Sequence, residues 1–179
     1  MKFELPEKAS TILSMIQELL STAAVASLPL VEQRLAIPLG FFSWDLTIWQ
    51  AVLAGTGGNI ISVGFVLWLW PKLAQFARKH SPFCDRILTK IFANTRAKHS
   101  HNVKTWGNIF LIFFVMLPVP GSGGWSGSLV AWLFGFSYWR AMKLITIGLI
   151  LGGIIIAIAI VGVDQSIQYF TEVIEEDLL

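Results

Sequence analysis

Long runs of apolar residues, interrupted at a few places by charges, prolines and glycines, set the pattern of this chain. Residues 51–70 and 144–163 carry no charge, and each run matches the roughly 20 residues that a helix needs to span a bilayer. We therefore predict at least two transmembrane helices, the first of which ends at Pro71.

Residues 106–139 form a third uncharged run, which Pro118 and Pro120 interrupt. The run is shorter than the roughly 40 residues of two full crossings, and Lys104 and Arg140 flank it with positive charge. Because basic flanks favour the cytoplasmic side, both ends are expected there. The run then predicts a re-entrant hairpin that enters the membrane, turns at the Pro/Gly motif and returns.

The first half of the chain has the same order of segments. Residues 10–26 have the helical amphipathic spacing of a segment that lies at a membrane interface. A run broken at Glu32, Arg34 and Pro38 follows, and then comes the charge-free run 51–70. In the second half, an amphipathic segment marked by Phe83, Ile87, Ile91 and Phe92 precedes the 106–139 hairpin.

These patterns predict an all-α, polytopic integral membrane protein with two re-entrant hairpins in an inverted repeat, an architecture common among transporters. The alternative is four to five plain helices with proline kinks. Residues 1–179 would form a single membrane domain. Its parts are repeat 1 (about 10–70), a basic segment (71–105), repeat 2 (about 82–163) and an acidic tail (164–179).

Composition agrees with a membrane location. Hydrophobic residues make up 55% of the chain and charged residues only 13%, against about 25% charged residues in soluble domains. Most of the Lys and Arg residues lie in segment 71–105, which the positive-inside rule places in the cytoplasm. They do not form a nucleic-acid patch, and the single cysteine, Cys84, excludes an internal disulfide. The acidic N-terminus does not resemble a cleaved signal.

Glu32 and Arg34 are the first candidates for function, because a charge in the bilayer needs a partner or water. In a low-dielectric cavity Glu32 would bind and release a proton readily, and Arg34 would hold an anionic group or balance Glu32. The alternative is an ordinary salt bridge near the outer interface. Asp45 is a second candidate proton carrier, although an interfacial charge explains it as well.

The Pro/Gly motif supplies the other candidates. Pro38 and Pro120 suit the first position of a returning half-helix, whose free backbone N–H groups would face a cavity. Ser122 is a candidate N-cap or a spare hydroxyl, and the glycines let a ligand approach the backbone. Asn59 could bond across helices or contact a substrate. The alternative for the glycines is a tight turn with close packing. The proposed pathway residues are Glu32, Arg34, Pro38, Asn59, Pro118, Pro120, Gly121, Ser122, Gly123 and Trp125.

The two motifs resemble those of a bacterial family named for small multidrug export, whose patterns are ELRxAIPLG and PLPGTGAWTG. This chain reads EQRLAIPLG from Glu32 and PVPGSGGWSG from Pro118, and the likeness spans about residues 28–162. Gln33 stands where the family usually has Leu, a difference not expected to touch the chemistry. The family is distantly similar to the DedA/VTT proteins, which implies two re-entrant hairpins and movement of lipids or polyprenyl phosphates. DedA proteins carry an Arg in the second hairpin, whereas this chain has no charge between Lys104 and Arg140.

We therefore expect a transporter of the bacterial inner membrane, with proton-coupled export of small molecules through a midplane site. It would contact membrane lipid, form a homodimer and need no metal or cofactor. A lipid or polyprenyl-phosphate flippase or scramblase is one alternative, and a structural membrane protein without a substrate is another. Enzymatic function is not expected, because no nucleophile–base set is present.

Overall fold

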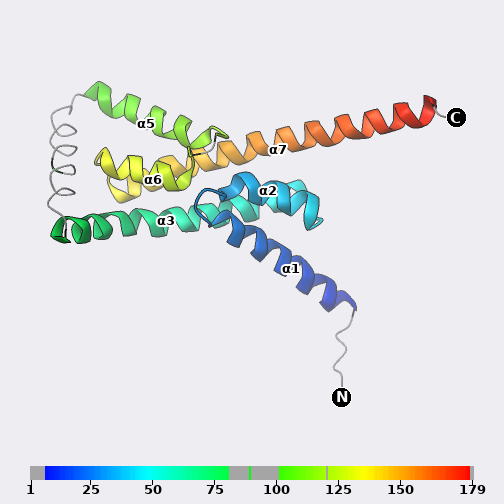
Figure 1. Cartoon of the computed structure of the whole chain (residues 1–179), viewed down its shortest axis with the longest axis horizontal. Coiled ribbons are helices and arrows are strands. Elements are labelled where there is room, and N and C mark those ends of the chain that lie inside the picture. Colours follow the sequence, from blue (N-terminus) through cyan, green and yellow to red (C-terminus); the bar gives the residue numbers. More distant parts are fainter. Residues whose placement is uncertain (1–6, 81–88, 90–100, 120, 178–179) are drawn as a thin grey trace, which may run out of the picture.

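The computed structural model describes residues 7–80, 89, 101–119 and 121–177, and the elements in them are all helices, as the sequence predicts. The first half contains α1 (Glu7–Ala26), α2 (Glu32–Ser43) and α3 (Ile48–His80), and the second contains α5 (His101–Met116), α6 (Gly124–Leu133) and α7 (Tyr138–Asp177) (Figure 1). Within the described residues, each half therefore has two shorter helices followed by a long one. The amphipathic segment expected around residues 83–92 lies outside the described residues, apart from Thr89.

Three of the described helices are long and apolar enough to cross a membrane, namely Lys8–Ala26, Ile48–His80 and Tyr138–Tyr169. The last two confirm the two expected spanning helices and extend well beyond the charge-free runs. For residues 10–26 the sequence predicts an interfacial helix, whereas the structure gives a helix with the length and composition of a third span. This helix, α1, packs against α2 and α3.

α3 continues through Pro71 to His80, so the predicted end at Pro71 is wrong. A proline inside a helix removes one hydrogen bond and crowds the carbonyl four residues before it. Across this turn, Lys72 Nζ lies 3.4 Å from the centroid of the Trp68 ring. This cation–π contact joins consecutive helical turns at the position of the proline.

Pro38 lies inside α2, so it does not begin a returning half-helix as predicted. The chain reverses earlier, in the turn before Glu32, where Leu30 has a φ of 72°. Close packing keeps α2 helical despite the proline. A Cβ added to Gly40 would lie 3.1 Å from both Ala51 of α3 and Thr22 of α1, so α2 fits tightly between those helices.

The third uncharged run is interrupted at its Pro/Gly motif, as predicted. α5 ends at Met116 and α6 begins at Gly124, and the two helices contact each other and turn back on each other (Figure 1). We call the segment between them the α5–α6 break (residues 117–119 and 121–123). Pro120, which the sequence places at the start of the returning helix, lies outside the described residues.

Two apolar cores lie along α3 and α7, with a polar layer between them. One core contains Val63, Leu67, Leu111, Val115, Ala131, Ala141, Ile145 and Leu149, and the other contains Ile37, Leu46, Ala51, Val52, Ala157 and Ile160. Between these cores α3 carries three buried polar residues, Thr56, Asn59 and Ser62. Together with Gln33 of α2, which is also buried, they form what we call the polar layer. On α7 the buried pair between the cores is Gly152 and Gly153.

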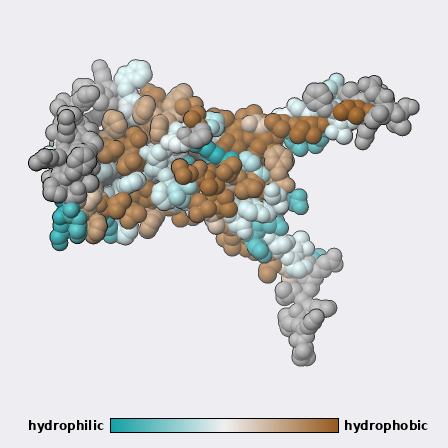
Figure 2. Space-filling model, in the orientation of Figure 1, coloured by the Kyte–Doolittle hydropathy of each residue, from teal (hydrophilic) through white to brown (hydrophobic). Residues whose placement is uncertain are grey.

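The surface is unusually apolar. Figure 2 shows hydrophobic residues over most of the visible face, with hydrophilic ones gathered near the end of α3 and along α1. Large side chains that are more than half exposed include Leu20, Leu53, Ile61, Phe65, Phe110, Phe113 and Ile158. Such a surface is unfavourable in water but suits contact with lipid, in agreement with the candidate spans.

Candidate functional site

The Glu32 carboxylate lies against the first turn of α6, although 92 residues separate it from Gly124. Oε2 accepts the backbone N–H of Gly124 at 3.1 Å, and Oε1 accepts that of Trp125 at 2.9 Å. The first N–H groups of a helix have no partner within the helix, and this end also carries its positive dipole. Glu32, which is only 5% exposed, therefore caps α6 with a buried negative charge.

The backbone on both sides allows this close approach. Glu32 itself has a φ of 49°, in the left-handed region, which turns α2 sharply at its first residue. On the other side, a Cβ added to Gly123 would lie 1.5 Å from Oε2 of Glu32. No other residue fits at position 123 while the carboxylate stays in place. Gly123 is thus a site residue because it leaves room for Glu32.

Arg34 binds the other side of the same break. Its guanidinium donates to the backbone carbonyls of Leu117 (2.8 Å), Val119 and Ser122, and to the Ser122 hydroxyl at 3.1 Å. These groups lie in the α5–α6 break, between the last residue of α5 and the N-cap of α6, where backbone carbonyls have no helical partner. The planar fork of arginine can serve several such acceptors at once.

Glu32 and Arg34 thus complement opposite ends of one interrupted helix pair. The acid holds the N-terminal end of α6, and the base holds the carbonyls that follow α5. The sequence leaves open whether the two form an ordinary salt bridge. In the described structure their charged groups form no direct ion pair, and each binds backbone groups instead. Sequence patterns gave no indication of these partners.

Ser122 does not cap α6 as predicted, because Gly123 occupies the N-cap position. The Ser122 hydroxyl lies 3.0 Å from the Leu117 carbonyl and 2.9 Å from that of Val119, and so helps to shape the α5–α6 break. Pro118 and Gly121 are exposed within this break, and Gly121 has the positive φ, 86°, that favours glycine. The tight-turn interpretation therefore holds for Gly121.

Trp125 joins the two halves of the chain at the same place. Its indole N–H donates to the Ser27 carbonyl at 3.3 Å, in the turn after α1. The Ser27 hydroxyl in turn donates to the Gly58 carbonyl of α3 at 3.0 Å. The sequence predicts Trp125 in the wall of the site. The structure adds that its indole binds the turn after α1 directly.

Asn59 lies behind this contact and is fully buried. Its Oδ1 is 2.9 Å from the position that a Cβ on Gly124 would take, so it faces the start of α6. Two neighbours in the polar layer, Gln33 and Thr56, are not among the residues that the sequence predicts for the site. Gln33 is buried beside Glu32, and its Nε2 donates to the Leu149 carbonyl at 2.9 Å. A polar residue at each of these otherwise apolar positions was the available signal.

Asp45 lies away from this group. It is exposed in the connection between α2 and α3 and has a φ of 50°. Asp45 therefore does not lie beside Glu32, and its role as a proton carrier or an interfacial charge stays a prediction.

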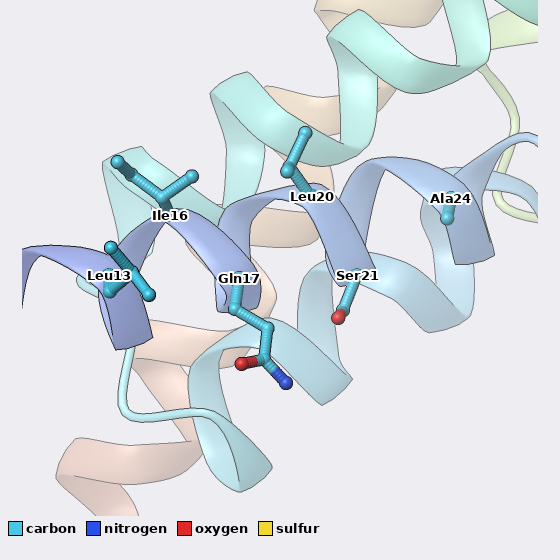
Figure 3. A pocket seen from close by; sticks show the side chains of 6 residues that line it. All are labelled: Leu13, Ile16, Gln17, Leu20, Ser21 and Ala24. Atoms are coloured by element: carbon cyan, nitrogen blue, oxygen red, sulfur yellow. The ribbon is translucent and has the colours of Figure 1, made fainter. Parts of the chain in front are cut away.

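A separate groove lies along α1, on the side shown in Figure 3. Its lining comes from one helix alone: Leu13, Ile16, Gln17, Leu20, Ser21 and Ala24. None of these residues belongs to the polar layer or to the contacts around Glu32. The groove is therefore a feature of the outer surface and not part of the candidate site.

Comparison with known proteins gives one family. Residues 32–155 match the family model described as "Putative small multi-drug export protein". No curated protein and no solved structure matches the chain. The matched region begins at Glu32 and includes the α5–α6 break and the Gly152–Gly153 pair, so it covers the whole candidate site. With more than half of its length matched, the chain belongs to this family of small multi-drug export proteins.

Proposed function

We propose that this protein exports small molecules across the bacterial inner membrane, coupled to protons, through a midplane site where α2 meets the α5–α6 break. The family description supports export, and three membrane-length helices support the location. The observation that carries the proposal is the contact of Glu32 with Gly124 and Trp125. It joins a buried carboxylate to interrupted backbone, a combination that membranes tolerate where it serves a cavity or pathway.

Helix lengths support re-entrant hairpins. α2 has 12 residues and α6 has 10, which at 1.5 Å per residue gives about 18 Å and about 15 Å. Neither can cross a hydrocarbon core of about 30 Å. α2 leads into α3, and α6 leads into α7. If the last residues of α2 and α6 lie at the membrane surfaces, the first residues of these two helices lie near mid-membrane. Glu32 and Gly124 are those first residues.

The distribution of basic residues supports the sidedness. Arg78 and Lys79 end α3, Lys104 lies near the start of α5, and Arg140 lies near the start of α7. Arg140 also donates to Asn108 Oδ1 at 2.7 Å, which joins the first turn of α7 to the middle of α5. These helix ends lie at the same end of the molecule (Figure 1). The positive-inside rule would place that end in the cytoplasm.

The order of packing supports an inverted repeat. α1 and α2 pack on α3, α5 packs on α7, and α3 packs on α7, whereas α6 packs more extensively on α3 than on α7. The site then lies where the two repeats meet, which is the usual place for substrate and coupling-ion sites in such transporters. The homodimer expected from the sequence stays a prediction, which cross-linking of the protein in membranes would test.

The chemistry of the Glu32 contact supports the proposal of proton coupling. The charged carboxylate offers both oxygens to N–H donors at the positive end of α6. A proton on one oxygen turns it into a donor and removes the charge, so the contact weakens. The first turn of α6 could then separate from Glu32 while Arg34 keeps its hold on the carbonyls of the α5–α6 break. Binding and release of a proton would thus shift the site between two arrangements.

The test is transport by the purified protein in liposomes. An acidic interior should drive uptake of the cationic dye ethidium, and an ionophore that removes the pH gradient should stop it. We expect Glu32→Gln, which mimics the protonated residue, to reduce uptake to the protein-free background. Asp45→Asn is the matched control, because it removes an exposed acid. Uptake without a gradient, or undiminished uptake by Glu32→Gln, would count against proton coupling at this site.

A structural role without a substrate is the second candidate. It is favoured by the engagement of both Glu32 and Arg34 with backbone groups, since neither needs a ligand to be satisfied. In that case the wild type would carry no solute, while Glu32→Gln would still lower its stability. The flippase alternative predicts that the same liposomes move a fluorescent phospholipid between leaflets.

A further inference from the structure

Three buried side-chain atoms in the polar layer have no hydrogen-bond partner in the described structure. They are Gln33 Oε1, Thr56 Oγ1 and Asn59 Nδ2. The three side chains are at most 7% exposed. Folded proteins leave few buried polar atoms unpaired, because each loses its hydrogen bonds to water without replacement. Three such atoms in one layer therefore call for a common explanation.

The antiparallel packing of α2 and α3 brings these residues to one level. Gly40 lies beside Ala51 and Ile37 beside Gly55, and the same register sets Gln33 level with Asn59. Thr56 lies one helical turn from Asn59 on the same side of α3.

α7 borders the same level without side chains of its own. Thr56 Oγ1 lies 2.8 Å from the position that a Cβ on Gly153 would take, and Gln33 Nε2 lies 3.1 Å from that on Gly152. Thr56 and Gln33 thus border the paired glycines of α7, while Asn59, one turn from Thr56 on α3, borders the start of α6 at Gly124.

The unpaired atoms define the chemistry of a ligand. Gln33 offers an acceptor, Asn59 offers a donor, and the Thr56 hydroxyl can do either. The charged neighbours from the packed helices are Glu32 and Arg34, and backbone groups already engage both. A cation would meet the Asn59 N–H groups, and an anion would meet the Gln33 oxygen. A neutral group that both donates and accepts satisfies all three.

We infer that Gln33, Thr56 and Asn59 form a binding site for a neutral hydrogen-bonding group. This group is either internal water or a hydroxyl or amide of a transported solute. The solute alternative rests on the proposed export function, whereas the water alternative does not. In both cases the uncharged side chains of the polar layer bind the group. Glu32 and Arg34 do not, because both already bind backbone groups of the α5–α6 break and of α6.

Thermal unfolding of the purified protein in detergent tests the site without a transport assay. Thr56→Val keeps the shape and removes the hydroxyl, and Thr22→Val is its matched control. Thr22 is also fully buried, but its hydroxyl donates to the Glu18 carbonyl of its own helix at 2.9 Å. If a ligand occupies the layer, Thr56→Val lowers the Tm by several degrees more than Thr22→Val. If the layer is empty, Thr56→Val removes an unsatisfied group and leaves the Tm unchanged or higher, which overturns the inference.

Two further measurements complete the test. Gln33→Leu and Asn59→Leu should lower the Tm in the same way, and a rise with either would contradict the site. Chloramphenicol, a neutral probe with hydroxyl and amide groups, separates the two sources. A rise in the wild-type Tm with chloramphenicol that Thr56→Val abolishes identifies a solute site. No rise, together with the lowered Tm of Thr56→Val, identifies internal water. Because none of these readouts involves transport, failure here is distinct from failure of the export proposal.

Discussion

Oε1 of Glu32 accepts the backbone N–H of Trp125 at 2.9 Å, so the first residue of α2 caps the first turn of α6. This contact joins the two halves of the chain through a buried charge. Arg34, two residues later, binds the carbonyls on the opposite side of the break. One short motif in the first half therefore holds both sides of the interruption in the second half.

The first prediction concerns the contribution of the Glu32 charge to stability. Glu32→Gln keeps the size of the side chain but directs an amide N–H toward backbone donors and removes the attraction to the helix dipole. Because hydrogen bonds to charged groups contribute about 1.5–3 kcal/mol, we expect a loss of about 2 kcal/mol. For a chain of this size that lowers the Tm by about 4–8 °C. Asp45→Asn, at an exposed acid, should change stability by less than about 0.5 kcal/mol. Equal shifts for the two variants would show that the cap contributes nothing.

The second prediction concerns the geometry of Arg34. Arg34→Lys keeps the positive charge but replaces a planar fork with a single ammonium group, which cannot reach all the acceptors of the break. We expect faster hydrogen–deuterium exchange in the α5–α6 break and little change in α3. Arg78→Lys makes the same replacement at an exposed position at the end of α3 and should leave the break unchanged. Exchange at the wild-type rate in Arg34→Lys would mean that charge alone holds the break.

The third prediction uses two adjacent glycines of α3. A Cβ added to Gly58 would lie 2.2 Å from the backbone oxygen of Ala23, whereas one added to Gly57 would meet nothing within 4 Å. Gly58→Ala must push α1 away from α3 and should lower the Tm strongly. Gly57→Ala should be neutral or raise stability by about 0.5–1 kcal/mol, because alanine favours the helix. If both variants unfold at the same temperature, the close packing of α1 on α3 is wrong.

Several features of the fold could be predicted from local sequence. The charge-free runs located α3 and α7, and the Pro/Gly motif located the α5–α6 break, because lipid-length apolar runs and helix-breaking residues act through the local backbone. Pro38 and Pro71 were misjudged for a related reason. In both places the helix continues through the proline in a setting that local sequence does not reveal: close packing at Gly40 in one, and the Lys72–Trp68 contact in the other.

The site could be predicted only in part. A buried acid and base in a broken segment identified Glu32 and Arg34, but their partners lie more than 80 residues away and belong to the backbone. Backbone groups carry no sequence signal, so these contacts could not be read from residue types. Gln33 and Thr56 were missed because a single polar residue in an apolar helix also suits a surface position. Their burial became evident only with the packing of α2 and α3 against α7.

The accessibility of the break from each side of the membrane tests the central claim most directly. In a Cys84→Ser background, Val119→Cys places a thiol on the exposed side of the break, and Leu39→Cys places one on α2. Both would be treated with a membrane-impermeant maleimide in inside-out and right-side-out vesicles. Two opposed re-entrant hairpins predict labelling of Val119→Cys from the cytoplasmic side alone and of Leu39→Cys from the opposite side alone. Protection of both thiols from both sides, or labelling of both from the same side, would contradict the account.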